Sequence, residues 1–232
     1  MWWAFPGLHL LRRRQLAQRL PTGPLRDFYA CPPPQRSNAL TDTTFAVLDF
    51  ETTGLDPRHD HIISLGYVEI RQLAVRLDSA WHSLVATPRV LPENTTVVHK
   101  LTDDTVARGR HLEPVVAELL GKLSGKVLIA HQARIELGFL QRICNELYDA
   151  PLILPWLDTQ ELAQRHLRRQ QLPMEKRTLR LFNLRARFGL PDYTAHNALY
   201  DAIGTAELFL ALVFELNPRL DGRLGDLKPR WS

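Results

Sequence analysis

The chain has 232 residues, 45% of them hydrophobic, and a formal net charge of +4. This length suits one globular domain with an extension and is enough for a sizeable core. No apolar run reaches the length of a membrane span, and Cys31 and Cys144 lack metal-ligand spacing, so we expect no membrane association and reduced thiols in a cytoplasmic protein.

The first 42 residues are basic and rich in proline. Residues 1–40 hold six arginines against the single acid Asp27, which leaves a net charge of −1 for the rest of the chain. The sequence predicts a short basic helix through Leu20 and then a stretch, residues 21–34, whose prolines prevent one continuous helix. We interpret residues 1–42 as an N-terminal extension.

A buried strand is predicted over residues 44–50, and two carboxylates, Asp49 and Glu51, lie at its end. Side chains two positions apart on a strand project to the same face, so these carboxylates converge. Their desolvation must be compensated, and a hard divalent cation such as Mg²⁺ or Mn²⁺ would do so. The alternative is a strand end whose acids simply reach solvent. The turn at residues 53–57 then bends the chain away.

The following elements alternate in type. Three consecutive strands followed by alternating helices and strands predict a mixed sheet covered by helices. The expected segments are strands near 61–70 and 76–86, a short helix near Thr102 to Ala107, a helix near 113–123, a strand at 126–130, a helix at 133–148, a last strand within 152–159, and helices near 159–169, 178–188 and 197–215.

Glu136 is a third candidate carboxylate. Residues 127–140 read as a short buried strand that runs into a helix starting near His131, and Glu136 falls in the second turn of that helix. Ile135 and Phe139, four residues apart, form its apolar stripe.

The segment from Arg165 to Arg187 carries eight basic residues against only Glu175. Such a cluster is commonly a solvated helical face. It equally suits contact with the phosphates of a polyanion, and we keep both interpretations. The candidates for nucleic-acid backbone contact are Arg168, Arg169, Arg177 and Arg180.

The last predicted helix carries a fourth carboxylate, Asp201, five residues after His196. A histidine at the start of a helix, close to carboxylates that hold a metal, is well placed to take a proton from an attacking water. The apolar positions with helical period are Leu199, Ile203, Ala206 and Leu210.

These blocks together resemble the DEDDh family of 3′–5′ exonucleases, which includes the proofreading ε subunit of bacterial DNA polymerase III. The resemblance runs from about Thr44 to about Leu212. The first motif, Asp-x-Glu-Thr-Thr-Gly, contains Asp49 and Glu51, and the third is His196 followed after four residues by Asp201, which is the spacing of the histidine branch. Residues 98–103 resemble the family's His-Gly-Ile-Thr stretch, with a lysine where glycine is usual.

The second motif departs from the family pattern. The family has His-Asn-Ala-x-Phe-Asp, whereas residues 131–136 read His-Gln-Ala-Arg-Ile-Glu. Glu136 is the only carboxylate in register, and its extra methylene requires a helix set farther back or another rotamer. The alternative is a decayed site without catalysis.

The resemblance implies an α/β, ribonuclease H-like fold: a mixed five-stranded sheet flanked by helices, with Asp49 and Glu51 on the central strand. It implies two-metal hydrolysis with Mg²⁺ or Mn²⁺. Asp49 would bridge both ions, Glu51 and Asp201 would complete the first, Glu136 would support the second, and His196 would be the general base.

The resemblance also suggests contacts to the substrate. Thr52, Thr53 and Leu55 would hold the 3′-terminal nucleotide, and His99 would frame the same pocket unless it is a surface loop residue. His131 is interpreted as a structural hydrogen-bonding residue. The exonuclease domain would span residues 43–216, and residues 217–232 would form a short C-terminal tail.

Three functions follow as hypotheses. The first is removal of nucleotides from a free 3′ end of DNA, preferably single-stranded, in repair, replication or proofreading. The second is the same chemistry on RNA ends, because discrimination at the 2′-OH depends on pocket shape. The third is a non-catalytic nucleic-acid-binding module. A polymerase partner is compatible with the resemblance, but no polymerase-binding tail is evident, so a free-standing nuclease is favoured.

Overall fold

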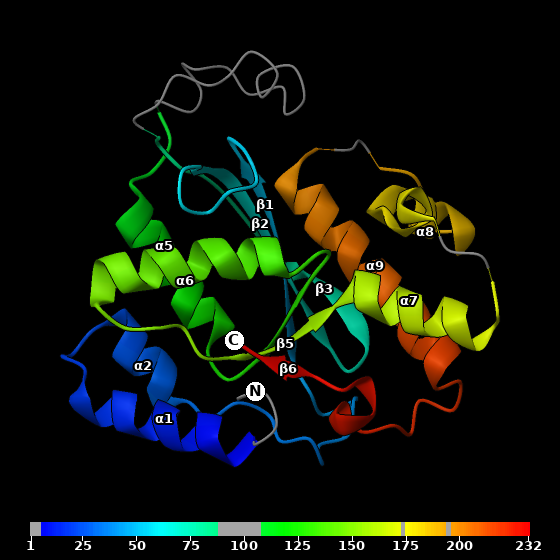
Figure 1. Ribbon diagram of the computed structural model, residues 1–232, viewed down its shortest axis with the longest axis horizontal. Coiled ribbons are helices and arrows are strands. Elements are labelled where there is room, and N and C mark those ends of the chain that lie inside the picture. The colour runs from blue at the N-terminus through cyan, green and yellow to red at the C-terminus, as the bar shows by residue number, and fades with distance from the viewer. Residues whose placement is uncertain (1–5, 88–107, 173–174, 194–195) are drawn as a thin grey trace.

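The computed structural model describes residues 6–87, 108–172, 175–193 and 196–232. Its centre is a sheet with the strand order β3-β2-β1-β4-β5-β6 (Figure 1). The strands are β1 (Phe45–Thr52), β2 (Ile62–Arg71), β3 (Ala74–Leu84), β4 (Val127–Ala130), β5 (Pro155–Asp158) and β6 (Arg230–Trp231). His99 and the short helix expected near Thr102 to Ala107 lie outside the described residues.

The helices flank this sheet on both faces (Figure 1). The helices are α1 (Pro6–Arg19), α2 (Pro24–Ala30), α5 (Leu112–Leu123), α6 (Arg134–Tyr148), α7 (Thr159–Arg169), α8 (Leu181–Arg187) and α9 (Ala198–Leu216), with 3₁₀ turns η1 (Lys176–Leu179) and η2 (Leu224–Leu227). Apart from α2 and η2, which were not expected, their bounds match the expected segments within a few residues. The helix expected near 178–188 is instead a 3₁₀ turn and a shorter α-helix, separated by Arg180 in an extended conformation.

The sheet is mixed, as expected, and β1 is central. It pairs antiparallel with β2 and parallel with β4, while β4 pairs parallel with β5. The expected strand count of five is wrong, because β6 adds a sixth strand antiparallel to β5, with Trp231 opposite Pro155. A strand of two residues is too short to show an alternating pattern in the sequence. It forms only because the C-terminal segment returns to the edge of the sheet.

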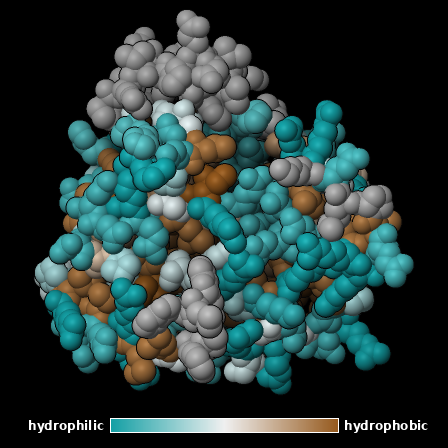
Figure 2. Space-filling model, viewed as in Figure 1, coloured by the Kyte–Doolittle hydropathy of each residue, from teal (hydrophilic) through white to brown (hydrophobic). Residues whose placement is uncertain are grey.

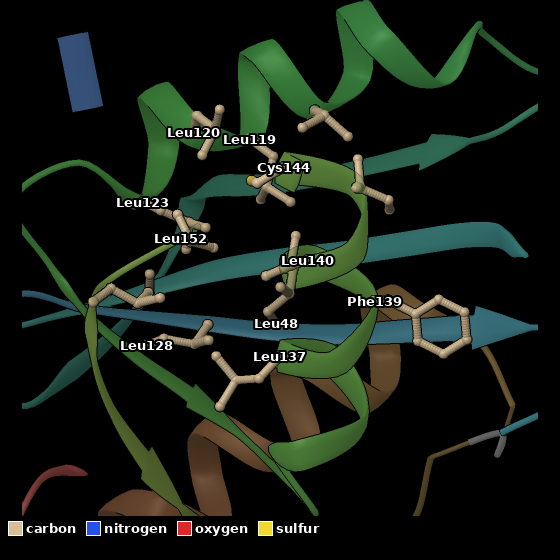
Figure 3. Close-up of a cluster of buried hydrophobic side chains, with 14 of the residues drawn as sticks. Leu48, Leu119, Leu120, Leu123, Leu128, Leu137, Phe139, Leu140, Cys144 and Leu152 are labelled. Carbon is tan, nitrogen blue, oxygen red and sulfur yellow. The ribbon is translucent and has the colours of Figure 1, made fainter. Parts of the chain in front are cut away.

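Alternation along β1 divides the core into two layers. Ala46, Leu48 and Phe50 belong to the layer under α5 and α6, where leucines of both helices meet Leu48 and Leu128 (Figure 3). Phe45 and Val47 face the other way, into the layer under α7, α8 and α9. Since Asp49 and Glu51 continue the series of Phe45 and Val47, their position on the strand turns them toward α9.

The N-terminal segment is packed onto the domain. Leu25, Phe28 and Tyr29 of α2 are buried in the layer that contains α5. Arg13 of α1 is only 3% exposed and donates to the carbonyl oxygens of Phe28, Cys31 and Ile153. The stretch 21–34 is not one continuous helix, as expected, but it contains the seven-residue helix α2, which begins at Pro24. Proline is well tolerated at that first helical position.

Candidate active site

Asp49 and Glu51 meet Asp201 between β1 and the start of α9. One carboxylate oxygen from each of the three residues lies within 4.8 Å of the others. Glu51 and Asp201 are 6% and 7% exposed and Asp49 is half-buried, so most of this cluster is removed from water. The structure thus brings together three of the four carboxylates that the sequence singled out.

Gly66 allows α9 to come this close to the sheet. Gly66 lies opposite Asp49 on β2. A Cβ atom at this position would be 2.1 Å from the carbonyl oxygen of Ala198, the first residue of α9. The absence of a side chain therefore sets the distance between the first turn of α9, which carries Asp201, and the acids of β1.

The electrostatics of the cluster favour a bound cation. Burial raises the pKa of Asp49 well above its usual range, and the charges of Glu136, Asp201 and Glu51 raise it further. Carboxylates this close repel one another unless a proton or a cation intervenes. Carboxylate oxygens are the ligands that Mg²⁺ and Mn²⁺ prefer, so the residues present fit a divalent metal.

Glu136 lies beside this cluster but outside the set of three. It is 3% exposed, and burial, with the nearby charges of Asp158 and Glu51, raises its pKa to about 8 against the opposing effect of a backbone hydrogen bond. Its Oε2 atom is buried and has no hydrogen-bond partner among the described residues. A buried carboxylate oxygen without a partner is costly, and a cation or its water would satisfy it.

Asp158 fixes the start of the helix that carries Glu136. Its carboxylate accepts the backbone N–H groups of Gln132 at 3.1 Å, Ala133 at 3.2 Å and Gln160 at 2.8 Å. The helix begins at Arg134, after a turn in which Gln132 has a φ of 62°. Sequence reasoning assigned Asp158 no role. The available signal was a lone acid at the end of an apolar strand, directly before a helix.

His131 is a structural residue in this arrangement. Its Nε2 donates to the carbonyl oxygen of Leu179 at 3.0 Å, and its Nδ1 pairs with the Thr159 hydroxyl at 2.8 Å. Burial lowers the pKa of His131 to about 4, which keeps the ring neutral. It joins the ends of β4, α7 and η1.

His196 stands at the entrance to α9 with an exposed side chain. Its backbone N–H donates to Oδ2 of Asp201 at 3.1 Å, and its φ is 65°. Positive φ is uncommon for a residue with a side chain and costs free energy unless the surroundings impose it. The side chain of the next residue, Asn197, accepts the backbone N–H groups of Leu199 and Tyr200 and caps the helix.

The residues expected to contact the nucleotide, Thr52, Thr53 and Leu55, lie at the end of β1 and in the loop after it. Leu55 is 72% exposed, which suits a wedge against a base. The Thr53 hydroxyl donates to Asp60 and accepts the backbone N–H of His61, so it closes the loop. The Thr52 hydroxyl donates to the carbonyl oxygen of Gly54 at 2.7 Å.

The basic residues of the 165–187 segment divide into two groups. Arg168, Arg169, Arg177 and Arg180 are exposed. Arg185 is 1% exposed, forms an ion pair with Glu207 at 2.8 Å and donates to the Gly204 carbonyl oxygen, so its role is to pack α8 on α9. The segment is therefore not one solvated helical face.

A mixed sheet with this strand order, with two acids on its central strand clustered against a third from α9, is the arrangement of a class of metal-dependent nucleases. Residues 46–209 match the family described as Exonuclease, and the chain belongs to that family. The resemblance to the ε subunit and its relatives is confirmed.

Two curated relatives show the range of this family. The chain is 29% identical over 170 residues to DNA polymerase III subunit epsilon of Treponema pallidum, covering 73% of this chain and 76% of that protein. It is 33% identical over 172 residues to DNA polymerase III PolC-type of Thermotoga maritima, covering 74% of this chain. The matched part is only 12% of the length of that PolC-type polymerase.

Solved structures share the fold. Exonuclease X in complex with 5′-overhanging duplex DNA has a TM-score of 0.60 at 20% identity, covering 79% of this chain and 99% of that one. The zinc-bound complex of Escherichia coli ExoI with single-stranded DNA has a TM-score of 0.62 at 16% identity, covering 77% of this chain and 42% of that one. The expected ribonuclease H-like fold is confirmed. Within the described ranges no helix is long and apolar enough to span a membrane.

Proposed function

We propose that this protein is a DEDDh-type 3′–5′ exonuclease that releases nucleoside monophosphates from the 3′ end of DNA. The observation that carries the proposal is the convergence of Asp49, Glu51 and Asp201 within 4.8 Å, on the face of the sheet that meets the start of α9. Names of relatives, both of them DNA polymerase III proteins, support DNA as the substrate.

The candidate residues divide the work of phosphodiester hydrolysis. Asp49, Glu51 and Asp201 would hold the first of two Mg²⁺ or Mn²⁺ ions, and Asp49 would also be a ligand of the second. The Oε2 atom of Glu136, which has no hydrogen-bond partner among the described residues, would support this second ion. Two such ions, when bound, stabilise the attacking and leaving oxygens of an in-line displacement. Burial of the carboxylates strengthens these interactions, because charges attract more strongly away from water.

His196 would take the proton from the attacking water. The hydrogen bond from its backbone N–H to the Asp201 carboxylate places it next to the carboxylate cluster, and its side chain is exposed. At the end of β1 and in the loop that follows it, Thr52 and Thr53 would contact the terminal nucleotide, and exposed Leu55 would press against its base. Exposed Arg168, Arg169, Arg177 and Arg180 would contact the strand's phosphates.

The domain boundaries belong to the same proposal. The exonuclease domain would span residues 43–216, with residues 1–42 as an extension and residues 217–232 as a tail. The Exonuclease match, residues 46–209, supports the central range. A polymerase partner is compatible with the ε-like relative.

The test is cleavage of 5′-labelled single-stranded DNA, duplex DNA, RNA and circular single-stranded DNA, with Mg²⁺ or Mn²⁺. We expect stepwise shortening of the linear DNA strands from the 3′ end, fastest on single strands, and none in excess EDTA or on circles. The matched control is Asp201→Asn, which keeps the shape and removes the charge. Faster cleavage of RNA would favour the exoribonuclease hypothesis. Binding without cleavage of any substrate would favour the non-catalytic module.

A further inference from the structure

A second concave site lies between α7 and the C-terminal strand β6, away from the three-carboxylate cluster. It is a pocket of about 350 Å³, and four basic side chains line it, Arg165, Arg168, Lys228 and Arg230. We call it the α7–β6 pocket. Figure 1 shows α7 leaving the end of β5 and the C-terminal segment passing beneath it, so residues distant in sequence build the two walls.

The pocket has more positive than negative charge. Glu161 forms an ion pair with Arg230 at 3.1 Å. The carboxylate of Asp158 already accepts hydrogen bonds from three backbone N–H groups. Within the described ranges, no ion pair involves Arg168 or Lys228. The surface over α7 and α8, on the right in Figure 2, is mostly hydrophilic.

The cations are crowded together. Arg165 donates to the carbonyl oxygen of Leu227 at 2.6 Å, which holds its guanidinium in the pocket. Burial lowers the pKa of Arg165, and the positive charges of Arg169 and Arg230 lower it further, against the effect of Glu161. Guanidinium groups that are held close to one another attract an anion and match the geometry of phosphate oxygens.

Lys228 adds an independent observation. Its φ is 57° and its ψ is 57°, the left-handed conformation that glycine or asparagine adopts most easily at the end of a helical turn. A lysine at such a position costs backbone free energy relative to glycine or asparagine. In return, Lys228 adds a basic side chain to the lining of the pocket, beside Arg165, Arg168 and Arg230.

The position of the pocket indicates which phosphate it would bind. Asp158 lines the pocket and also holds the start of α6, the helix that carries Glu136. Arg165 and Arg168 follow Asp158 along α7, so they lie roughly 10–15 Å from it at the helical rise per residue. Because the Asp158 carboxylate holds Ala133, three residues before Glu136, the pocket begins beside the start of α6 and extends along α7 away from the candidate active site.

We propose that the α7–β6 pocket binds backbone phosphates of the substrate strand a few nucleotides away from the bond that is cleaved. This inference rests on the proposed exonuclease function and adds a second anchor for long strands. A dinucleotide would not reach the pocket, whereas a long strand would engage both sites at once. The pocket therefore raises affinity for long strands without taking part in the chemistry.

The experiment measures binding of a labelled long single strand of DNA to the full chain in EDTA, by fluorescence anisotropy over a salt series. Lys228→Gly removes one cation and relieves the left-handed backbone, so the variant should fold at least as stably as wild type. We expect several-fold weaker binding and a salt slope reduced by about 0.7 for one lost phosphate contact. Arg165→Gln should act in the same direction.

Arg19→Gln, an exposed arginine in the last turn of α1, is the matched control and should leave affinity and slope unchanged. Cleavage of a dinucleotide by Lys228→Gly should keep the wild-type kcat/KM. Unchanged affinity for the long strand in both pocket variants would overturn the proposal. It would also be overturned if an acidic polypeptide bound wild type but not Lys228→Gly and if DNA did not displace that polypeptide.

The two proposals fail separately. If wild type cleaves no nucleic acid but Lys228→Gly still weakens binding of the long strand, the exonuclease proposal fails and the phosphate pocket stands. If cleavage is normal and both pocket variants bind like wild type, only the pocket proposal fails.

Discussion

At the scale of single residues, the site combines groups that the sequence already paired. The backbone N–H of His196 donates to the side-chain Oδ2 of Asp201 at 3.1 Å, across the start of the helix. The positive φ of His196 is a strained backbone conformation, and its free-energy cost must be offset by the surrounding structure that holds this residue in place.

We expect His196→Ala to lower kcat by about 10²- to 10⁴-fold, the usual range for loss of a general base. Mn²⁺ binding should survive, because no carboxylate is changed, and calorimetry with Mn²⁺ measures this directly. Near wild-type turnover in the variant would remove His196 from the mechanism. His59→Ala, a change of an exposed histidine in the loop after β1, is the control.

Glu136 is where the chain leaves the family pattern, and the structure sharpens that prediction. Its carboxylate is buried next to Asp49 and Glu51 yet outside their 4.8 Å set. We expect Glu136→Gln to nearly abolish cleavage, because the charge is lost and the shape remains.

Glu136→Asp should also lower activity, because the shorter side chain would retreat from a cluster that Glu136 itself does not fully join. Steady-state kinetics at saturating Mn²⁺ distinguish the outcomes. Higher turnover in Glu136→Asp would mean that glutamate strains a site suited to aspartate, and wild-type rates in Glu136→Gln would show that the residue is not catalytic.

At the scale of elements, the approach of α9 to the sheet depends on Gly66. We expect Gly66→Ala to push α9 away, because the new Cβ would lie 2.1 Å from the Ala198 carbonyl oxygen. Activity and Mn²⁺ affinity should fall together, and thermal stability should drop. Gly121→Ala is the matched control, since its Cβ would meet nothing within 4 Å and alanine is favoured in a helix. Intact Mn²⁺ affinity in Gly66→Ala would contradict this view.

His131 joins β4, α7 and η1, and it makes the fold sensitive to acid. Its folded pKa of about 4 lies below the usual 6.5, so the unfolded chain binds a proton more readily and stability is lost as the pH falls from about 6.5 to 4. At 1.36 kcal/mol for each tenfold change in proton affinity, the loss is on the order of 3 kcal/mol.

His131→Gln can keep the hydrogen bond to Leu179 without a titrating group. Urea unfolding between pH 7.5 and about 4 should therefore show a smaller decrease in the variant than in wild type, by roughly that amount. Equal decreases in the two proteins would assign the acid sensitivity to other groups.

At the scale of the whole molecule, the N-terminal segment behaves as part of the domain's packing. Arg13 lies within 5 Å of the ring centroids of Phe28 and Tyr29, at 4.6 and 4.9 Å, and satisfies three carbonyl oxygens. One of these, that of Ile153, lies just before β5. The segment therefore connects to the same sheet that carries the candidate site.

We expect Arg13→Ala to lower the free energy of unfolding by about 2–4 kcal/mol, because it leaves buried carbonyl oxygens without partners. The kcat should stay close to wild type, since Arg13 is not among the site residues. Arg12→Ala, at an exposed neighbouring position, should change stability by less than about 0.5 kcal/mol. Equal effects of the two substitutions would show that the docking of α1 contributes little.

The sequence by itself determined most of the helices and strands of the sheet's core, and the face of the strand on which Asp49 and Glu51 lie. Both follow from local periodicity: a period of two fixes which side chains share a strand face, and a period near 3.6 fixes a helix stripe. The pairing of His196 with Asp201 is equally local, and the mixed sheet followed from the order of strands and helices.

Only the tertiary structure decided which distant groups meet. The hold of Asp158 on the start of α6, the contact of Gly66 with α9, the buried ion pair of Arg185, the strand β6 and the α7–β6 pocket all join residues far apart in the chain. No periodic pattern encodes them, because each depends on two surfaces packing in three dimensions. The physical reason is that the direction of a side chain follows from the local backbone conformation. Which distant residue it contacts depends instead on how the whole core packs.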